Sequence, residues 1–282
     1  MACISGCTVW DGTPTFAAMS LLPHDQYLHH IRTDSRRFRD VLADCDPAAR
    51  VPGCPDWDAA DLLFHLAGVQ HFWSTIVRLR PEGPDAVTEL ERPATYDALL
   101  ALYDTSSTAL VEALAEAGPD EQAWTWAPEQ TVGFVFRRQA HEALIHRLDA
   151  EQAAGKQTAL DPALAADGVA EVLGVMYGGG PAWGTFTPRD GLVRFDVGGL
   201  ADPIFVRLGW FTGTDPDSGK TYDEADLGVV PDDGTRPDVV VAGASEVLDA
   251  WLWRRGGDDG IAVQGDDDVF GRFRQIVDQP IT

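Results

Sequence analysis

Three side chains in this sequence have the types and spacing needed to bind one metal ion. Glu142 and His146 stand four residues apart in a stretch of helical periodicity, so both project from one face of the helix, about one turn apart. His65 lies on the apolar stripe of an earlier predicted helix, which turns its imidazole toward the interior. Two imidazole nitrogens and one carboxylate suit zinc in a catalytic arrangement, because three protein ligands leave one coordination position open.

Spacing alone leaves other interpretations of these residues open. A single inward histidine such as His65 is commonly a satisfied core residue, and a Glu–His pair at helical spacing is commonly a surface pair. Asp149 lies three residues beyond His146 and could orient its imidazole. His141 is either a fourth ligand or a packed neighbour. The remaining histidines have no partner spacing and are expected on the surface or in packing: His24, His29, His30 and His71.

Four amphipathic helices are predicted to position these residues. They run over residues 27–45, from Asp56 or Asp58 to about residue 80, from Thr95 to 117, and from Phe134 to Gly155. Apolar residues recur in them at helical spacing opposite a polar face, and Asp, Thr and Gly stand where helix ends need caps. Four such helices predict an antiparallel bundle, with the link over residues 118–131 as its one irregular crossover.

The chain changes character after Gly155. Short apolar or alternating stretches predict strands over residues 193–197, 204–210, 239–242 and 261–263. Further helices are expected from Asp161-Pro162 and over residues 245–255 and 267–277. This half predicts an α+β fold with a mostly antiparallel sheet and helices on one face. The predicted division is a leader over residues 1–22, a metal-binding bundle over 23–157 and a smaller α+β domain over 158–282.

The composition limits the partners of the protein. The 282 residues include 45 acidic and 21 basic side chains, a formal net charge of -24, which repels phosphate backbones and anionic lipid. We expect neither nucleic-acid nor membrane partners. The absence of a long apolar run or a basic leading segment predicts a cytoplasmic protein, a monomer or weak homo-oligomer. The cysteines are too few and too clustered for a disulfide framework: Cys3, Cys7, Cys45 and Cys54.

Several stretches of the sequence resemble the mycothiol-dependent maleylpyruvate isomerase family of actinobacterial type. In the N-terminal half they are Val51-Pro52-Gly53-Cys54-Pro55-Asp56-Trp57, residues 61–66 and residues 138–151. In the C-terminal half they are residues 239–243, 251–255 and 263–266. The resemblance implies a DinB-like four-helix bundle that binds a metal, followed by a smaller α+β domain similar to sterol carrier proteins.

The resemblance also implies roles for particular residues. His65, Glu142 and His146 match, without departure, the positions that bind zinc in the family. The family's C-terminal arginine matches Arg254 or Arg255, which are therefore the candidate catalytic residues.

The implied function is that of a zinc-dependent enzyme, or one with another divalent metal, that uses mycothiol as a thiol cosubstrate. A metal-bound thiol is deprotonated and becomes a nucleophile. As an isomerase, the enzyme would use that thiolate to convert maleylpyruvate to its trans isomer. As an S-transferase, it would attach the thiol to a small electrophile. The alternatives are a non-catalytic metal-binding or regulatory module and, ranked last, a lipid carrier.

Arginines and tryptophans near the predicted ligands carry further expectations. Arg138 is the candidate cofactor-binding residue. Arg137 and Arg147 are expected to make solvated ion pairs, as arginines near helix ends commonly do. Three tryptophans could line a cleft but are expected mainly in core packing: Trp57, Trp73 and Trp183.

Overall fold

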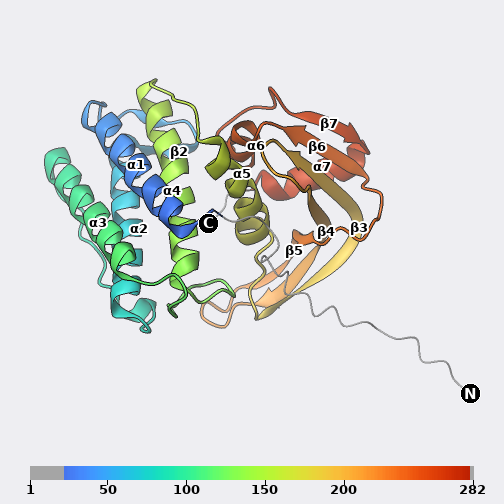
Figure 1. The fold of residues 1–282 in the computed structure, drawn as a ribbon, viewed down its shortest axis with the longest axis horizontal. Coiled ribbons are helices and arrows are strands. Elements are labelled where there is room, and N and C mark those ends of the chain that lie inside the picture. The colour runs from blue at the N-terminus through green and yellow to red at the C-terminus, as the bar shows by residue number, and fades with distance from the viewer. Residues whose placement is uncertain (1–21, 280–282) are drawn as a thin grey trace, which may run out of the picture.

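The computed structural model describes residues 22–279, which form two parts lying side by side (Figure 1). Helices build the N-terminal part, and a five-stranded sheet with helices packed against it builds the C-terminal part. The predicted fold class, a helical bundle followed by an α+β domain, is confirmed. The predicted leader lies outside the described residues except for Leu22, and so do Cys3 and Cys7. Within residues 22–279, no helix has both the length and the apolar character needed to span a bilayer.

Four long helices make up the N-terminal part, as predicted. They are α1 (His24–Ala43), α2 (Ala59–Leu79), α3 (Tyr96–Glu116) and α4 (Val132–Ala154). Local sequence sets their ends. Asp58 and Asp61 form a capping box at the start of α2, and Thr95 caps α3. Gly155 ends α4 with a φ of 64°, a left-handed conformation that glycine adopts without a steric penalty.

The connections of the bundle differ from the prediction in two respects. Strands β1 (Arg50–Val51) and β2 (Cys54–Asp58) form a short antiparallel hairpin ahead of α2 that is absent from the prediction. The link over residues 80–95 is also long, and it is irregular apart from the 3₁₀ turn η2 (Pro84–Ala86). The prediction of a single irregular crossover, over residues 118–131, is therefore wrong, because the bundle has two.

The C-terminal part begins with a helix and continues into the sheet. Its helices are α5 (Pro162–Glu171), which continues as the π-helix η3 (Val172–Tyr177), α6 (Ser245–Leu252) and α7 (Asp267–Val277). Its strands are β3 (Gly184–Val197), β4 (Ile204–Thr214), β5 (Thr221–Val230), β6 (Val239–Gly243) and β7 (Ala262–Gly265). The strand order is β5-β4-β3-β6-β7, and only the β3–β6 pair is parallel. The mostly antiparallel sheet is confirmed, whereas the acidic edge strand β5 is absent from the prediction.

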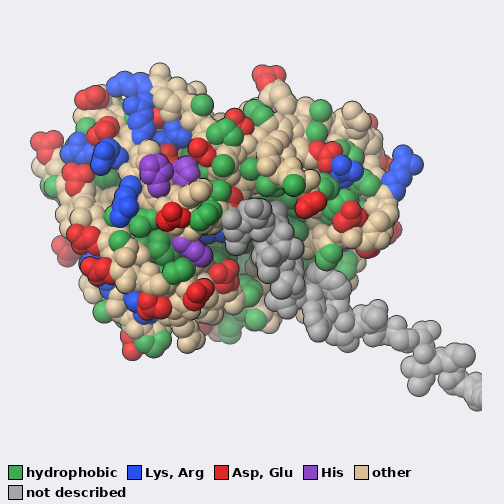
Figure 2. All heavy atoms as spheres, in the orientation of Figure 1, with side chains coloured by type: hydrophobic (Ala, Val, Ile, Leu, Met, Phe, Trp, Pro, Cys, Tyr) green, Lys and Arg blue, Asp and Glu red, His purple; other side chains and the backbone are tan. Residues whose placement is uncertain are grey.

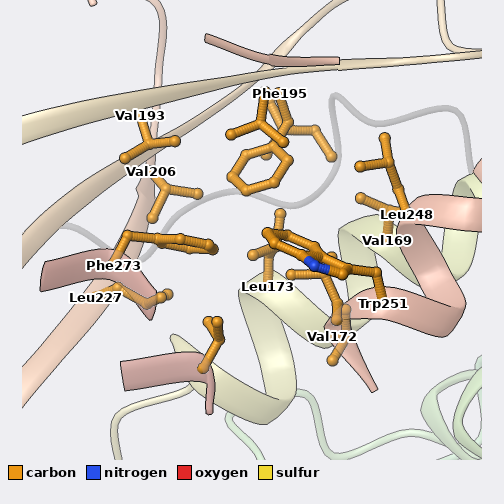
Figure 3. Packing of buried hydrophobic residues seen from close by; sticks show 14 of the residues in the cluster. Val169, Val172, Leu173, Val193, Phe195, Val206, Leu227, Leu248, Trp251 and Phe273 are labelled. Carbon is orange, nitrogen blue, oxygen red and sulfur yellow. The ribbon is translucent and has the colours of Figure 1, made fainter. Parts of the chain in front are cut away.

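The core of the C-terminal part lies between one face of the sheet and its helices (Figure 3). Val193, Phe195 and Val197 alternate along β3 and are buried on that face. Phe273 of α7 lies with its ring centroid 5.4 Å from that of Phe195 and 6.2 Å from that of Trp251 of α6. Each large side chain buried in this way contributes about 1.5–3 kcal/mol to stability. Helices on one face of the sheet are as predicted.

Helix α5 contributes to the cores of both parts. Its residues Leu164 and Ala165 belong to an apolar cluster of the bundle, whereas Val169 and Ala170 belong to the cluster under the sheet. Figure 1 accordingly shows α5 between the bundle and the strands. The domain boundary placed between residues 157 and 158 stays a prediction.

A carboxyl group is buried where α5 meets α6. Asp249 is fully buried, and a Cβ atom added to Gly168 of α5 would lie 2.8 Å from its carboxylate oxygens. Burial, together with the charges of Glu171 and Asp167, raises the pKa of Asp249 well above its usual range, and Arg138 offsets this only in part. The folded protein therefore binds this proton more tightly than the unfolded chain does.

The buried carboxyl group predicts a pH dependence of stability. Because the folded-state pKa is raised, the contribution of Asp249 is complete below the unfolded-state pKa of about 3.9 and is lost as the pH rises toward the folded-state value. We expect the free energy of unfolding, measured with urea at about pH 5 and about pH 8, to fall more in the parent than in Asp249→Asn. The same decrease in both proteins would contradict a protonated Asp249.

Candidate metal centre

His65, Glu142 and His146 converge within the bundle. The Nε2 atom of His146 lies 3.1 Å from Oε1 of Glu142, and Nε2 of His65 lies 3.4 Å from the same oxygen. Across residues 22–279, this is the one group in which three such ligand atoms of His, Cys, Asp or Glu lie within 4.8 Å of one another. The structure thus brings together the three residues that the sequence proposes as ligands.

Helix α4 is buried along most of its length and, within that buried stretch, is partly exposed to solvent at one residue. From Val132 to Glu151, every residue is buried except Glu142, which is partly exposed. The carboxylate at this position is the one that faces both imidazoles. His65 reaches it from α2, whose first turn is fixed by the capping box at Asp58. The one partly exposed position in this buried stretch is therefore the position where the candidate ligands meet.

A second layer of polar contacts orients His146. Its Nδ1 atom lies 3.0 Å from Oδ2 of Asp149, so Nδ1–H donates to the carboxylate and Nε2 is the ring nitrogen that faces Glu142. This contact is the one predicted for Asp149. Asp149 is fully buried and accepts hydrogen bonds from Nε and Nη2 of Arg255 at 2.9 and 3.0 Å. Because Arg255 follows α6, the C-terminal part of the chain contributes to this layer.

Glu142 and His146 stabilise each other's charged forms. Burial lowers the pKa of His146, but the charges of Glu142 and Asp149 outweigh burial and raise that pKa to about 9. Burial likewise raises the pKa of Glu142, but His146 and Arg138 hold it well below its usual range. Arg138 donates through Nη2 to Oε2 of Glu142 at 2.7 Å. Glu142 is therefore a carboxylate at neutral pH, the form that binds a cation.

The donor set fits a divalent ion. Two imidazole nitrogens and a carboxylate are ligands that zinc takes in catalytic sites with three protein ligands. Ligand atoms of one tetrahedral zinc ion lie roughly 3.3 Å apart, because each bond is about 2.0–2.1 Å long. The ligand atoms of His146 and Glu142 lie 3.1 Å apart, and those of His65 and Glu142 lie 3.4 Å apart. The side chains therefore have the chemistry of a metal site, and both contacts to Glu142 have its spacing, with all three ligand atoms within 4.8 Å of one another.

Two of the three tryptophans considered above line a cavity beside His65. Trp57, on β2, is half-buried, and its ring centroid lies 4.7 Å from that of His65. Trp73 of α2 belongs to the bundle core and also lines the cavity. Trp183 lies in the C-terminal part, is 36% exposed and packs against Phe211. Core packing therefore describes Trp73, whereas Trp57 lines the space next to the candidate centre.

The expectation of solvated ion pairs is wrong for Arg137 and Arg147. Both side chains are buried: Arg137 pairs with Asp167 of α5 at 2.9 Å, and Arg147 pairs with Asp34 of α1 at 2.8 Å. Since α4 has no solvent-facing side at these positions, its charged groups need partners inside the protein. His141 also contacts Asp167, at 2.8 Å, and is a packed neighbour outside the ligand group.

The arginines predicted to act in catalysis or cofactor binding have different surroundings. Arg255 donates to Asp149, which in turn contacts His146, so Arg255 is linked to the candidate centre through this carboxylate. Arg254 is exposed, has a φ of 60°, and donates through Nη1 to the carbonyl oxygen of Asp278 at 3.1 Å. Arg138 is buried, and its guanidinium pairs with two carboxylates. A catalytic role for Arg254 and Arg255 and a cofactor-binding role for Arg138 stay predictions.

An ion pair at the edge of the cavity was not predicted from the sequence. Arg92, in the link before α3, places Nη1 2.6 Å from Oδ1 of Asp61, and its guanidinium lies over the ring of Phe64 at 5.5 Å. Asp61 and Phe64 lie on the same helix as His65. Their place on this helix was the one sequence signal that could have placed them near the candidate centre. No periodicity could place Arg92, because it belongs to an irregular link.

The fold and the candidate site define a class of protein: a helical bundle with a His–Glu–His group, joined to an α+β domain. Residues 28–151 match the family model described as the mycothiol maleylpyruvate isomerase N-terminal domain. The bundle is therefore similar to that domain family, and the resemblance inferred from the motifs is confirmed.

Solved structures show the same fold over most of the chain. The crystal structure of the mycothiol-dependent maleylpyruvate isomerase is similar to it with a TM-score of 0.55 and 16% sequence identity, covering 86% of this chain and 93% of that chain. A histidine-to-alanine mutant of that isomerase gives a TM-score of 0.54 and 15% identity, with the same coverage. A comparison with curated proteins finds no match. At these identities, the likeness establishes the fold of both parts.

The second layer predicts how zinc affinity responds to substitution. Asp149→Asn should weaken zinc binding by roughly 10- to 100-fold, because a neutral amide orients His146 less strongly and no longer pairs with Arg255. A competition titration with a chromophoric chelator at fixed pH measures this change. The matched control Asp104→Asn alters an exposed pair with Arg39 and should leave the affinity unchanged. Equal affinity in Asp149→Asn and the parent would show that this carboxylate does not support the centre.

Proposed function

We propose that this chain is a metal-dependent enzyme that uses a small thiol to isomerise or modify a small electrophile. One observation carries the proposal: Glu142, the partly exposed residue within the buried stretch of α4, faces two imidazoles. The family match over residues 28–151 supports a reaction like that of maleylpyruvate isomerase. The finer assignments of the proposal are zinc as the ion, mycothiol as the thiol, an actinobacterial cytoplasm as the setting and a monomer or weak homo-oligomer as the state.

The residues of the centre have separate tasks in this proposal. His65, Glu142 and His146 would hold the ion, and when bound it supplies the Lewis acidity that lowers the pKa of a neighbouring thiol. Asp149 keeps Nδ1 of His146 protonated, so that Nε2 remains available as a ligand. Arg255 holds Asp149 in place from the C-terminal part. The geometry of the centre therefore depends on contacts that are already formed in the folded chain.

The thiol reacts by one of two routes, isomerisation or transfer. In an isomerase, the thiolate sulfur adds to one carbon of a conjugated double bond, and the resulting carbon–carbon single bond rotates. The same carbon–sulfur bond then breaks, which restores the double bond in the trans geometry and returns the thiolate. In a transferase, the sulfur displaces a leaving group that departs with its electron pair, and the carbon–sulfur bond remains. Neither route requires an oxidant or a reductant.

Matched histidine variants test the proposal. His146→Ala should lose bound zinc, measured by elemental analysis after gel filtration, and should lower the rate of mycothiol consumption with an electrophile by more than about 100-fold. The reason is that loss of a direct ligand costs more than loss of a supporting contact. His71→Ala is the control, because Nε2 of His71 contacts the carbonyl oxygen of Thr88, and it should change neither quantity.

A second variant and two outcomes complete this test. Glu142→Gln replaces His146→Ala if the latter does not fold. Zinc content equal to that of the parent in both variants would remove the candidate centre. A folded, zinc-loaded parent that consumes no mycothiol with maleylpyruvate or with neutral electrophiles would instead favour the non-catalytic metal-binding module.

A further inference from the structure

A cavity of about 880 Å³ adjoins the candidate centre. Its wall includes one stripe of α2, formed by His65, Gly68, Val69 and Phe72 at helical spacing. His65 therefore belongs both to the ligand group and to the cavity wall. A molecule bound in this cavity would lie beside the centre.

Aromatic rings supply much of the cavity wall. Trp57 comes from β2, whereas Phe64, Phe72 and Trp73 come from α2. The rings of Phe72 and Trp73 meet edge to face, with centroids 5.2 Å apart. Aromatic walls favour ligands with a flat apolar surface, which gain from ring contacts and from leaving water.

The charged residues of the cavity do not favour an anion. Asp56 and Asp61 line it together with Arg92, which is its only arginine among the described residues. Arg92 is already paired with Asp61 at 2.6 Å, so its charge is balanced and one carboxylate remains in excess. The cavity therefore lacks the bidentate guanidinium site that a carboxylate ligand prefers.

The arginines around the candidate centre are likewise already paired with carboxylates. Arg138 pairs with Glu142 and Glu171, and Arg255 pairs with Asp149. The formal net charge of -24 adds a repulsive field for anions. Figure 2 shows acidic side chains spread over both parts of the visible face.

Gly68 keeps space open in the cavity wall. It lies inside α2, where glycine weakens a helix relative to alanine. A Cβ atom added to Gly68 would meet no atom within 4 Å, so close packing does not require the glycine. A larger side chain at this position would project into the cavity one turn from His65.

We infer that this cavity binds the electrophile, and that it selects a neutral aromatic or otherwise apolar electrophile over a dicarboxylate. The inference rests on the proposed function for the reaction that follows binding. The binding itself depends only on the walls and charges of the cavity. It can therefore be measured without any thiol chemistry.

Calorimetric titration of the full-length protein, freed of metal with a chelator so that no carboxylate binds zinc directly, tests the inference with three unreactive probes. Nitrobenzene is neutral and aromatic, benzoate carries one negative charge on a ring, and maleate is a dianion. We expect nitrobenzene to bind at least about tenfold more tightly than maleate, with benzoate between them. Tighter binding of maleate than of nitrobenzene would overturn the inference.

Two glycine variants locate the binding site. Gly68→Leu should weaken nitrobenzene binding by about tenfold or more, because the new side chain occupies the cavity. Gly271→Leu is the matched control: Gly271 is an exposed residue within α7, and a Cβ atom there also meets nothing within 4 Å. The control should bind nitrobenzene as the parent does. Unchanged binding in a folded Gly68→Leu would place the ligand elsewhere and overturn the inference.

A third variant tests the charge argument. Asp61→Asn removes the carboxylate that balances Arg92 and should strengthen benzoate binding severalfold, whereas the control Asp104→Asn should not. Equal benzoate binding in folded Asp61→Asn and the parent would contradict this account of selectivity.

The outcomes also separate this inference from the proposed function. Nitrobenzene binding that Gly68→Leu abolishes, in a protein without thiol-transfer activity, would support the cavity and reject the enzyme. Thiol transfer to a neutral aromatic electrophile that persists unchanged in Gly68→Leu would support the enzyme and reject the cavity as its electrophile site.

Discussion

The structure depends on one constraint: α4 carries many charged side chains and is buried along almost its whole length. A buried charge without a partner is strongly unfavourable, so each charged residue of α4 selects a partner on another element. Arg147 pairs with Asp34 of α1, and Arg137 pairs with Asp167 of α5. Glu142 contacts His65 of α2. These pairs connect α4 to α1, α2 and α5, and Glu142 is the one of these three α4 residues that is partly exposed.

The same constraint joins the two parts of the chain. Arg138 reaches α5 through Glu171, and Asp149 reaches the residues after α6 through Arg255. Removing one partner of such a pair typically costs about 3–5 kcal/mol, because the other charge stays buried. The C-terminal part therefore acts on the candidate centre through position rather than direct contact, since Arg255 holds Asp149 and Asp149 holds His146. Asp149, a buried carboxylate that requires a charged partner, thereby also orients the imidazole of His146.

Local signals in the sequence were enough to predict the helices, most strands and the three convergent residues. Glu142 and His146 share a helix face by spacing alone, and the caps at Thr95 and Gly155 act within a few residues. The buried pairs of Arg137 and Arg147 could not be predicted, because periodicity assumes that a polar residue faces solvent. Helix α4 violates this assumption, since it is surrounded by α1, α2 and α5. Strand β5 was missed for a related reason: its acidic side chains obscure the alternation that marks a strand.

Helix α2 contributes both a candidate metal ligand and part of the cavity wall. One of its faces carries His65 toward Glu142, and the same face continues through Gly68 and Phe72 along the cavity. In the inferred electrophile site, a rigid helix would set the position of the electrophile relative to the centre, whereas side chains outside the ligand group, such as Arg92, would set its chemical type. A relative with the same fold and the same three ligands can thus differ in its electrophile through changes in the cavity wall alone. For this reason, the likeness to a maleylpyruvate isomerase shows the fold without identifying the substrate.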